Sequence, residues 1–156
     1  MKKIFTWVFL VVSVLFVIGL FVFKDQLNNA ASSMMYAQLS EPEKKQLAAR
    51  IDSLYNYQKH GKSYQLTFLE FGSTGCSACK RMESVLQTIE QKYVAKVQVV
   101  MYHISRAESR QLMKYYGVSV IPTQILLDDT GNPFFRHAGF CPEEKLDEMI
   151  QKKLEK

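Results

Sequence analysis

Residues 68–80 read Phe-Leu-Glu-Phe-Gly-Ser-Thr-Gly-Cys-Ser-Ala-Cys-Lys, and this stretch decides the fold of the chain. Its first part closes an apolar, β-prone run over 65–71, which predicts a buried strand. Two glycines mark a short loop over 72–75, and a helical pattern follows from Cys76 to about Tyr93. The sequence therefore predicts a strand, a tight loop and a helix, with two cysteines where the helix begins.

The position of Cys76 favours a reactive thiolate. A side chain at the first turn of a helix faces unpaired backbone N–H groups and the positive end of the helix dipole, and Lys80 and Arg81 add positive charge nearby. Cys79 comes one helical turn later, close enough to attack a mixed disulfide formed by Cys76. We expect Cys76 to be the attacking thiol and Cys79, further into the helix, to be the resolving one.

Two other uses of the cysteine pair are a metal site and a structural disulfide. A zinc site of the ribbon type needs a second pair of ligands, and the remaining cysteine and the three histidines show no paired spacing. A disulfide across two residues closes a small loop and stabilises little. We therefore expect a redox pair, with no metal and no cofactor.

The flanking patterns extend this unit into one α/β domain over 40–156. Ser40 and Glu43 form a capping-box signature for a helix that we expect to end near His60. Further elements are expected as a strand over 97–104, a helix over 108–116, a β-hairpin with strands over 124–127 and 134–137, and a last helix opened at 141–144. The strand–helix–strand order predicts parallel pairing of the first two strands.

Three groups of residues together resemble the thioredoxin family over roughly 64–156. They are the strand 68–71 leading into Cys-Ser-Ala-Cys-Lys, the segment 116–123 ending in Ile-Pro-Thr, and the hairpin ending at Gly139. The resemblance implies a thioredoxin-like fold, with a central mixed β-sheet flanked by helices. It also implies that Pro122 is cis and that Ile121, Pro122 and Thr123 bind the substrate chain beside the cysteines. An ordinary trans proline at the start of a strand is the alternative.

Glu70 stands six residues before Cys76, where the resemblance implies a buried acid that moves a proton to or from the resolving thiol. Burial in an apolar strand would raise the pKa of this carboxyl group toward the working range of a general base. The alternative is that strand alternation turns Glu70 outward into water. Departures from the family pattern leave the partner protein and the reduction potential of the cysteine pair open. Gly75 replaces a tryptophan, and Ser77-Ala78 replaces Gly-Pro. The lysine that often pairs with the buried acid in the family has no clear counterpart here.

Cys141 is the third and unpaired cysteine of the chain. Its place after Gly139 resembles a site near the rim of the substrate groove, with Pro142 at the first helical position. Two readings stay open. Cys141 either forms a mixed disulfide with a partner or with the active pair, or is a small packed side chain.

The N-terminal segment is the strongest compositional feature. Lys2 and Lys3 precede an uncharged, apolar run over 4–23, which as a helix would cover about 30 Å, the thickness of a bilayer's hydrocarbon core. We expect 1–23 to be a transmembrane anchor and 24–39 to be a linker, or tether; a cleaved signal peptide is the alternative. The basic N-terminus places the domain on the extracytoplasmic (periplasmic) side, where disulfides persist.

The expected function is an exported dithiol reductase at the cell membrane. It would act on disulfide-containing protein substrates, be re-reduced by a membrane electron donor, and contact the lipid bilayer through its N-terminal helix. A disulfide oxidase or isomerase would use the same site, because direction follows from the reduction potential, and protection of apocytochrome c cysteines is a narrower reducing role. A non-enzymatic metal- or partner-binding module is the competing class. The net charge of +5 is scattered among acids, which argues against nucleic acid.

Overall fold

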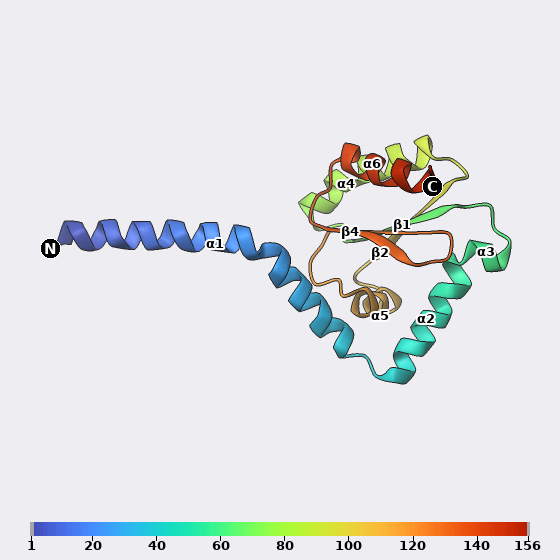
Figure 1. Cartoon of the computed structure of the whole chain (residues 1–156), viewed down its shortest axis with the longest axis horizontal. Coiled ribbons are helices and arrows are strands. Elements are labelled where there is room, and N and C mark those ends of the chain that lie inside the picture. The colour runs from blue at the N-terminus through green and yellow to red at the C-terminus, as the bar shows by residue number, and fades with distance from the viewer. Residues whose placement is uncertain (1, 156) are drawn as a thin grey trace.

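The computed structural model describes the backbone of residues 2–155 and the side chains of residues 7–20, 22, 23 and 26–155. A long N-terminal helix leads into a domain in which helices cover a β-sheet on both faces (Figure 1). The elements in chain order are α1 (Lys2–Ala37), α2 (Glu41–Tyr55), α3 (Tyr57–His60), β1 (Leu66–Gly72), α4 (Ser77–Lys92), β2 (Val97–His103), α5 (Ala107–Tyr116), β3 (Thr123–Leu127), β4 (Pro133–Ala138) and α6 (Glu143–Leu154).

The sheet has four strands in the order β2-β1-β3-β4. β1 pairs with β2 in parallel, as the connecting helix α4 requires, and β3 pairs antiparallel with both β1 and β4. The predicted mixed sheet and the parallel first pair are therefore confirmed. β1 is central and every residue in it is buried, which explains why its sequence is an apolar run without alternation.

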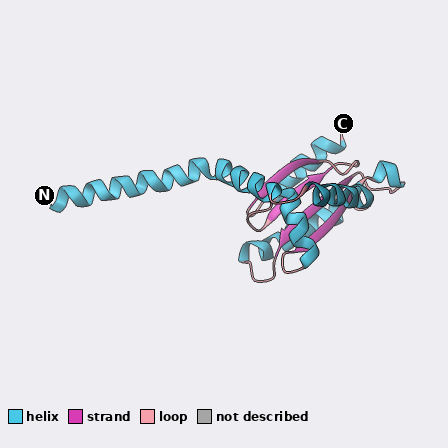
Figure 2. Ribbon diagram, turned by 90° about the horizontal axis from the view of Figure 1, so that it is seen from below, coloured by secondary structure: helices cyan, strands magenta, loops and turns pink. Residues whose placement is uncertain are grey.

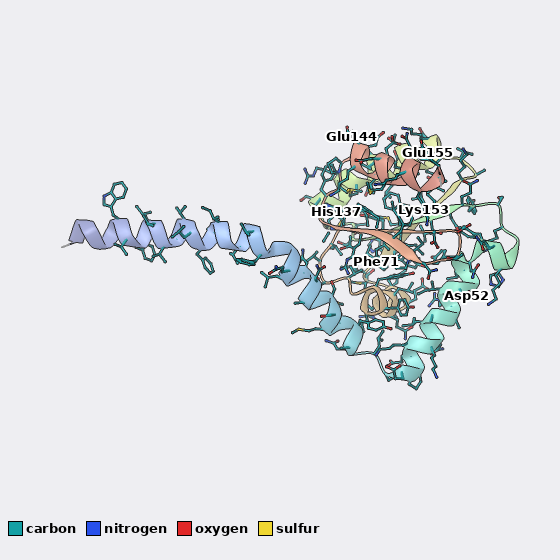
Figure 3. The ribbon with its side chains drawn as sticks, viewed as in Figure 1. Asp52, Phe71, His137, Glu144, Lys153 and Glu155 are labelled. Atoms are coloured by element: carbon teal, nitrogen blue, oxygen red, sulfur yellow. The ribbon has the colours of Figure 1, made fainter. Side chains whose placement is uncertain are left out.

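The two faces of the sheet carry separate apolar clusters. On one face Leu66, Phe68 and Leu126 pack with residues of α4 and α6. On the other face Leu69 and Phe71 pack with residues of α2 and α5. Figure 2 shows helices on either side of the strands, and Figure 3 places Phe71 on the α5 side. Even-numbered residues of β1 therefore face α4 and α6, and that side carries the site.

The segment 24–39, which the sequence predicts as a tether, is helical as far as Ala37 and is part of α1. Its last turns lie on α5, where the rings of Tyr36 and Tyr115 meet edge to face with centroids 5.8 Å apart. A Cβ atom at Gly117 would lie 2.6 Å from the backbone oxygen of Ser32, so the two helices approach closely. Polar residues here follow tertiary packing, which overrides their weak helical signal.

The sequence also predicts a membrane span over 4–23. Among the residues that the structure describes, no helix combines the length and the apolarity needed to cross a membrane.

The helix predicted from Ser40 to His60 is divided at Asn56. The capping box is present, with Ser40 and Glu43 bonded to each other, and α2 ends at Tyr55. The Asn56 side chain then accepts a hydrogen bond from the Lys59 N–H at 3.1 Å and so begins the short helix α3. A local side-chain cap ends one helix and begins the next.

Candidate active site at the cysteine pair

Cys76 is the N-cap residue of α4, directly after the loop that leaves β1. Its sulfur accepts a hydrogen bond from the backbone N–H of Cys79 at 3.2 Å, and its side chain is partly exposed. The Cys79 thiol and then the Cys79 N–H lower the pKa of Cys76, because both donate to its sulfur and favour the thiolate. Cys76 therefore has the position and the electrostatics of an attacking nucleophile.

The sequence also attributes a role to Lys80 and Arg81 in stabilising the thiolate. In the structure the principal contributions come from Cys79 and from the backbone N–H of Ala78, and neither basic residue is among them. The Arg81 guanidinium instead lies 4.6 Å from the centroid of the Phe140 ring. Hydrogen bonds from the Cys79 thiol and from backbone N–H groups at the start of α4, rather than neighbouring cations, favour the thiolate.

Cys79 lies one turn further along α4 and is 1% exposed. Burial, followed by the hydrogen bond to Cys76, raises the pKa of Cys79 to about 11. This thiol therefore needs a base before it can attack. The two cysteines differ in exposure and acidity in the sense that the sequence predicts, with Cys76 accessible and Cys79 buried.

Glu70 supplies a buried carboxyl group at this point of the sheet. Its side chain is 0% exposed, so the outward alternative is wrong. Burial raises the pKa of Glu70 to about 8, and the nearby amide of Gln124 opposes that rise in part. Charge repulsion from Glu70 also adds, in a minor way, to the raised pKa of Cys79. The predicted burial is confirmed; the proton-transfer role stays a prediction.

Gly72, at the end of β1, leaves room between the acid and the resolving thiol. A Cβ atom at Gly72 would lie 3.4 Å from Cys79 Sγ and 3.7 Å from Glu70 Oε1. The Cys79 sulfur and the Glu70 carboxyl oxygen therefore lie near the same residue, a glycine without a side chain to separate them. The sequence shows this glycine only as a loop marker, because its contact with α4 depends on the folded sheet.

The Ile-Pro-Thr segment lies at the same end of the sheet. The Ile121–Pro122 peptide bond is cis, as the resemblance implies. Thr123 is the β3 partner of Phe71, so the segment enters the sheet next to the end of β1. The Thr123 hydroxyl donates to the carbonyl of Val120 at 2.7 Å, which holds the turn before the strand. Substrate binding by these three residues stays a prediction.

Cys141 is fully buried between the sheet and α6, in the same cluster as Met82. Its N–H donates to the Met82 sulfur at 3.4 Å, and burial raises the pKa of its thiol. Pro142, rather than Cys141, is the N-cap of α6. Of the two readings for Cys141, the structure supports the packed side chain.

Two further observations concern metal ligands and a site residue that was not predicted. Within the described residues, no three His, Cys, Asp or Glu side chains come together as metal ligands. Gln124 is the site residue that sequence reasoning missed: it is fully buried beside Glu70, and its signal was an amide next to the apolar run 125–127.

Comparisons with known proteins agree with this geometry. The family model described as a thioredoxin-like domain matches residues 51–154. Thioredoxin of Bacillus subtilis is 32% identical over 85 residues, which cover 54% of this chain and 79% of that protein. A chloroplastic thioredoxin-like protein of Arabidopsis thaliana is 31% identical over 84 residues, covering 54% of this chain and 32% of that protein.

Among solved structures, the germline-specific thioredoxin Deadhead of Drosophila melanogaster superposes with a TM-score of 0.52 and 30% sequence identity. The match covers 63% of this chain and 90% of that one, so it spans most of that thioredoxin. Fold, cysteine pair and relatives agree, and this chain belongs to the thioredoxin-like family of thiol–disulfide oxidoreductases.

Proposed function

We propose that this protein is an exported dithiol reductase of protein disulfides. The observation that carries the proposal is the asymmetry of its cysteines: an accessible Cys76 with a lowered pKa, and a buried Cys79 with a raised pKa beside the acid Glu70. The first favours attack on a substrate, and the second delays resolution until a base removes the proton.

The reaction proceeds by two exchanges. The Cys76 thiolate attacks one sulfur of a substrate disulfide, whose S–S bond breaks as a mixed disulfide forms and the first substrate thiolate leaves. Ionised Glu70 accepts the proton of Cys79, and the Cys79 thiolate attacks the Cys76 sulfur. The second substrate thiolate leaves, so the substrate is reduced and the cysteine pair is oxidised. A membrane electron donor returns two electrons, which break the Cys76–Cys79 disulfide, and Glu70 returns its proton to Cys79.

The substrate chain is proposed to lie along the Ile-Pro-Thr segment. Ile121 and Pro122 lie just before β3, whose first residue, Thr123, pairs with Phe71 at the end of β1 that leads to the cysteines. An extended peptide could pair there with the backbone of Ile121.

The proposed location follows from the N-terminal segment. Lys2 and Lys3 precede the apolar run over 4–23, and the large apolar side chains described in that run are 47–71% exposed. An apolar helix surface of this size favours burial in lipid, with the basic end in the cytoplasm. Resistance to carbonate extraction, with the full mass in the membrane fraction, would support an anchor; a mass lacking the first thirty or so residues would overturn it.

The catalytic proposal is tested with insulin and dithiothreitol. The reduced protein should reduce insulin disulfides, Cys76→Ser should not, and Cys79→Ser should accumulate a mixed disulfide with the substrate. Cys141→Ser is the matched control and should retain activity, because that thiol is packed away from solvent. If the wild-type protein does not reduce insulin, the proposal is wrong.

The direction of electron transfer is tested by measuring the reduction potential of the Cys76–Cys79 couple, with the protein equilibrated against glutathione and dithiothreitol buffers. A potential well below that of the glutathione pool supports a reductase. A markedly higher one makes the protein an oxidase or isomerase, because the sign of electron flow follows the difference in potential.

A further inference from the structure

Glu70 and Gln124 form a polar pair inside an apolar layer. They are direct partners across β1 and β3, and both are 0% exposed. Side chains of direct partners stand on the same face of a sheet, with Cβ atoms about 5 Å apart. Both carboxyl oxygens of Glu70 and both polar atoms of the Gln124 amide have no hydrogen-bond partner among the described residues.

Apolar side chains flank the pair along the strands. Phe68 and Leu126, the neighbours on the same face, belong to the apolar cluster under α4 and α6. On the β2 side Glu70 is next to Met101, an apolar residue. An unpaired polar group in such a place is destabilising, so a hydrogen bond between the two side chains would stabilise both.

We propose that Gln124 is a positioning residue that complements Glu70 in both of its protonation states. Its amide NH₂ donates to the carboxylate, whereas its carbonyl oxygen accepts from the protonated carboxyl group. The terminal torsion of glutamine is broad and roughly two-fold, so a small rotation exchanges the two groups. Gln124 thus fills the place of a charged partner without fixing Glu70 in one state. The inference rests on the proposed function only in making Glu70 the base for Cys79.

The titratable groups around the pair are few. From α4 the thiols of Cys76 and Cys79 feel the charge of Glu70, and so does Cys141 before α6. On β4, His137 is the direct partner of Gln124, and Lys145 of α6 approaches its ring at 3.5 Å. Figure 3 shows His137 on the side of the sheet that faces α4 and α6.

The test is a direct titration of the Glu70 carboxyl carbon by ¹³C NMR, using the full reduced chain in detergent micelles. Gln124→Leu should raise the pKa of Glu70 by about one unit, because a hydrogen bond to a charged acceptor is stronger than one involving the neutral acid. Gln124→Asn, which keeps the amide on a shorter side chain, should give a smaller rise and is the second variant if the leucine protein does not fold.

Ile125→Val is the matched control. It changes packing at the next residue of β3, whose side chain belongs to the cluster on the opposite face, and should leave the titration of Glu70 unchanged. A Glu70 titration in both Gln124 variants that coincides with that of the wild type would overturn the proposal, because a packing role predicts lower stability alone. The rate at which a Cys76 mixed disulfide resolves should shift to higher pH in parallel. If the wild-type protein fails to reduce insulin but the titration moves, the proposed function is wrong and the role of Gln124 stands.

Discussion

Replacement of Glu70 by glutamine should stabilise the reduced protein, by an amount that grows with pH. Burial raises the pKa of Glu70 from an ordinary value of 4.5 to about 8. Between these values the folded protein holds a proton that the unfolded chain has lost, so wild-type stability falls as pH rises, by about 1.4 kcal/mol per unit. Neutral pH lies about 2.5 units above the lower value, which gives a penalty of about 3 kcal/mol that the variant lacks.

Urea denaturation of both proteins at intervals from about pH 5 to about pH 8 measures this difference. The two free energies of unfolding should change in parallel below about pH 5 and then diverge in favour of Glu70→Gln. Glu83→Gln is the control, because it makes the same substitution at an exposed position of α4. A difference between wild type and Glu70→Gln that stays constant over the whole range would refute the reasoning, because it would mean that Glu70 titrates alike in the folded and unfolded chain.

Other predictions test the remaining contacts. In the reduced protein at neutral pH, iodoacetamide should modify Cys76 well before Cys79, because Cys76 is accessible with a lowered pKa whereas Cys79 is buried; peptide mass spectrometry would expose equal labelling as a contradiction. Gly117→Ala should destabilise more than Gly61→Ala in thermal denaturation: both have φ of 64°, worth about 1 kcal/mol of strain, but only Gly117 also meets α1. Equal losses would exclude that contact. Arg136→Met should cost about 2 kcal/mol in urea denaturation, because the guanidinium donates to two backbone carbonyls at the end of α5; a negligible loss would contradict this.

The local parts of the fold could be predicted from the sequence. Ser40 with Glu43 begins α2, Gly117 ends α5, and the cysteine pair follows its strand and loop as expected. Each of these signals depends on residues within one turn of each other, where backbone hydrogen bonding and capping decide the conformation. The boundaries of α4 and α5 therefore agree with the sequence to within a residue or two, whereas the division at Asn56 and the helical segment up to Ala37 were not predicted.

Contacts between distant segments could not be predicted in the same way. Glu70 and Gln124 stand 54 positions apart (124 − 70), and only the register of β1 against β3 makes them partners. Burial of Cys141 likewise depends on how α6 lies over Met82. Hydrophobic patterns identify strands, but register follows from the assembled sheet.

The contact between α1 and α5 changes what the N-terminal segment does for the enzyme. As a flexible tether, the fourteen residues from 24 to 37 would have a root-mean-square end-to-end distance of about 20 Å, with no fixed direction. As a helix the same residues are about 21 Å long, and the helix packs against the end of α5 where Ser32 contacts Gly117. The cysteine pair is then held at a fixed distance and orientation relative to this part of α1, whereas a flexible tether would let both vary.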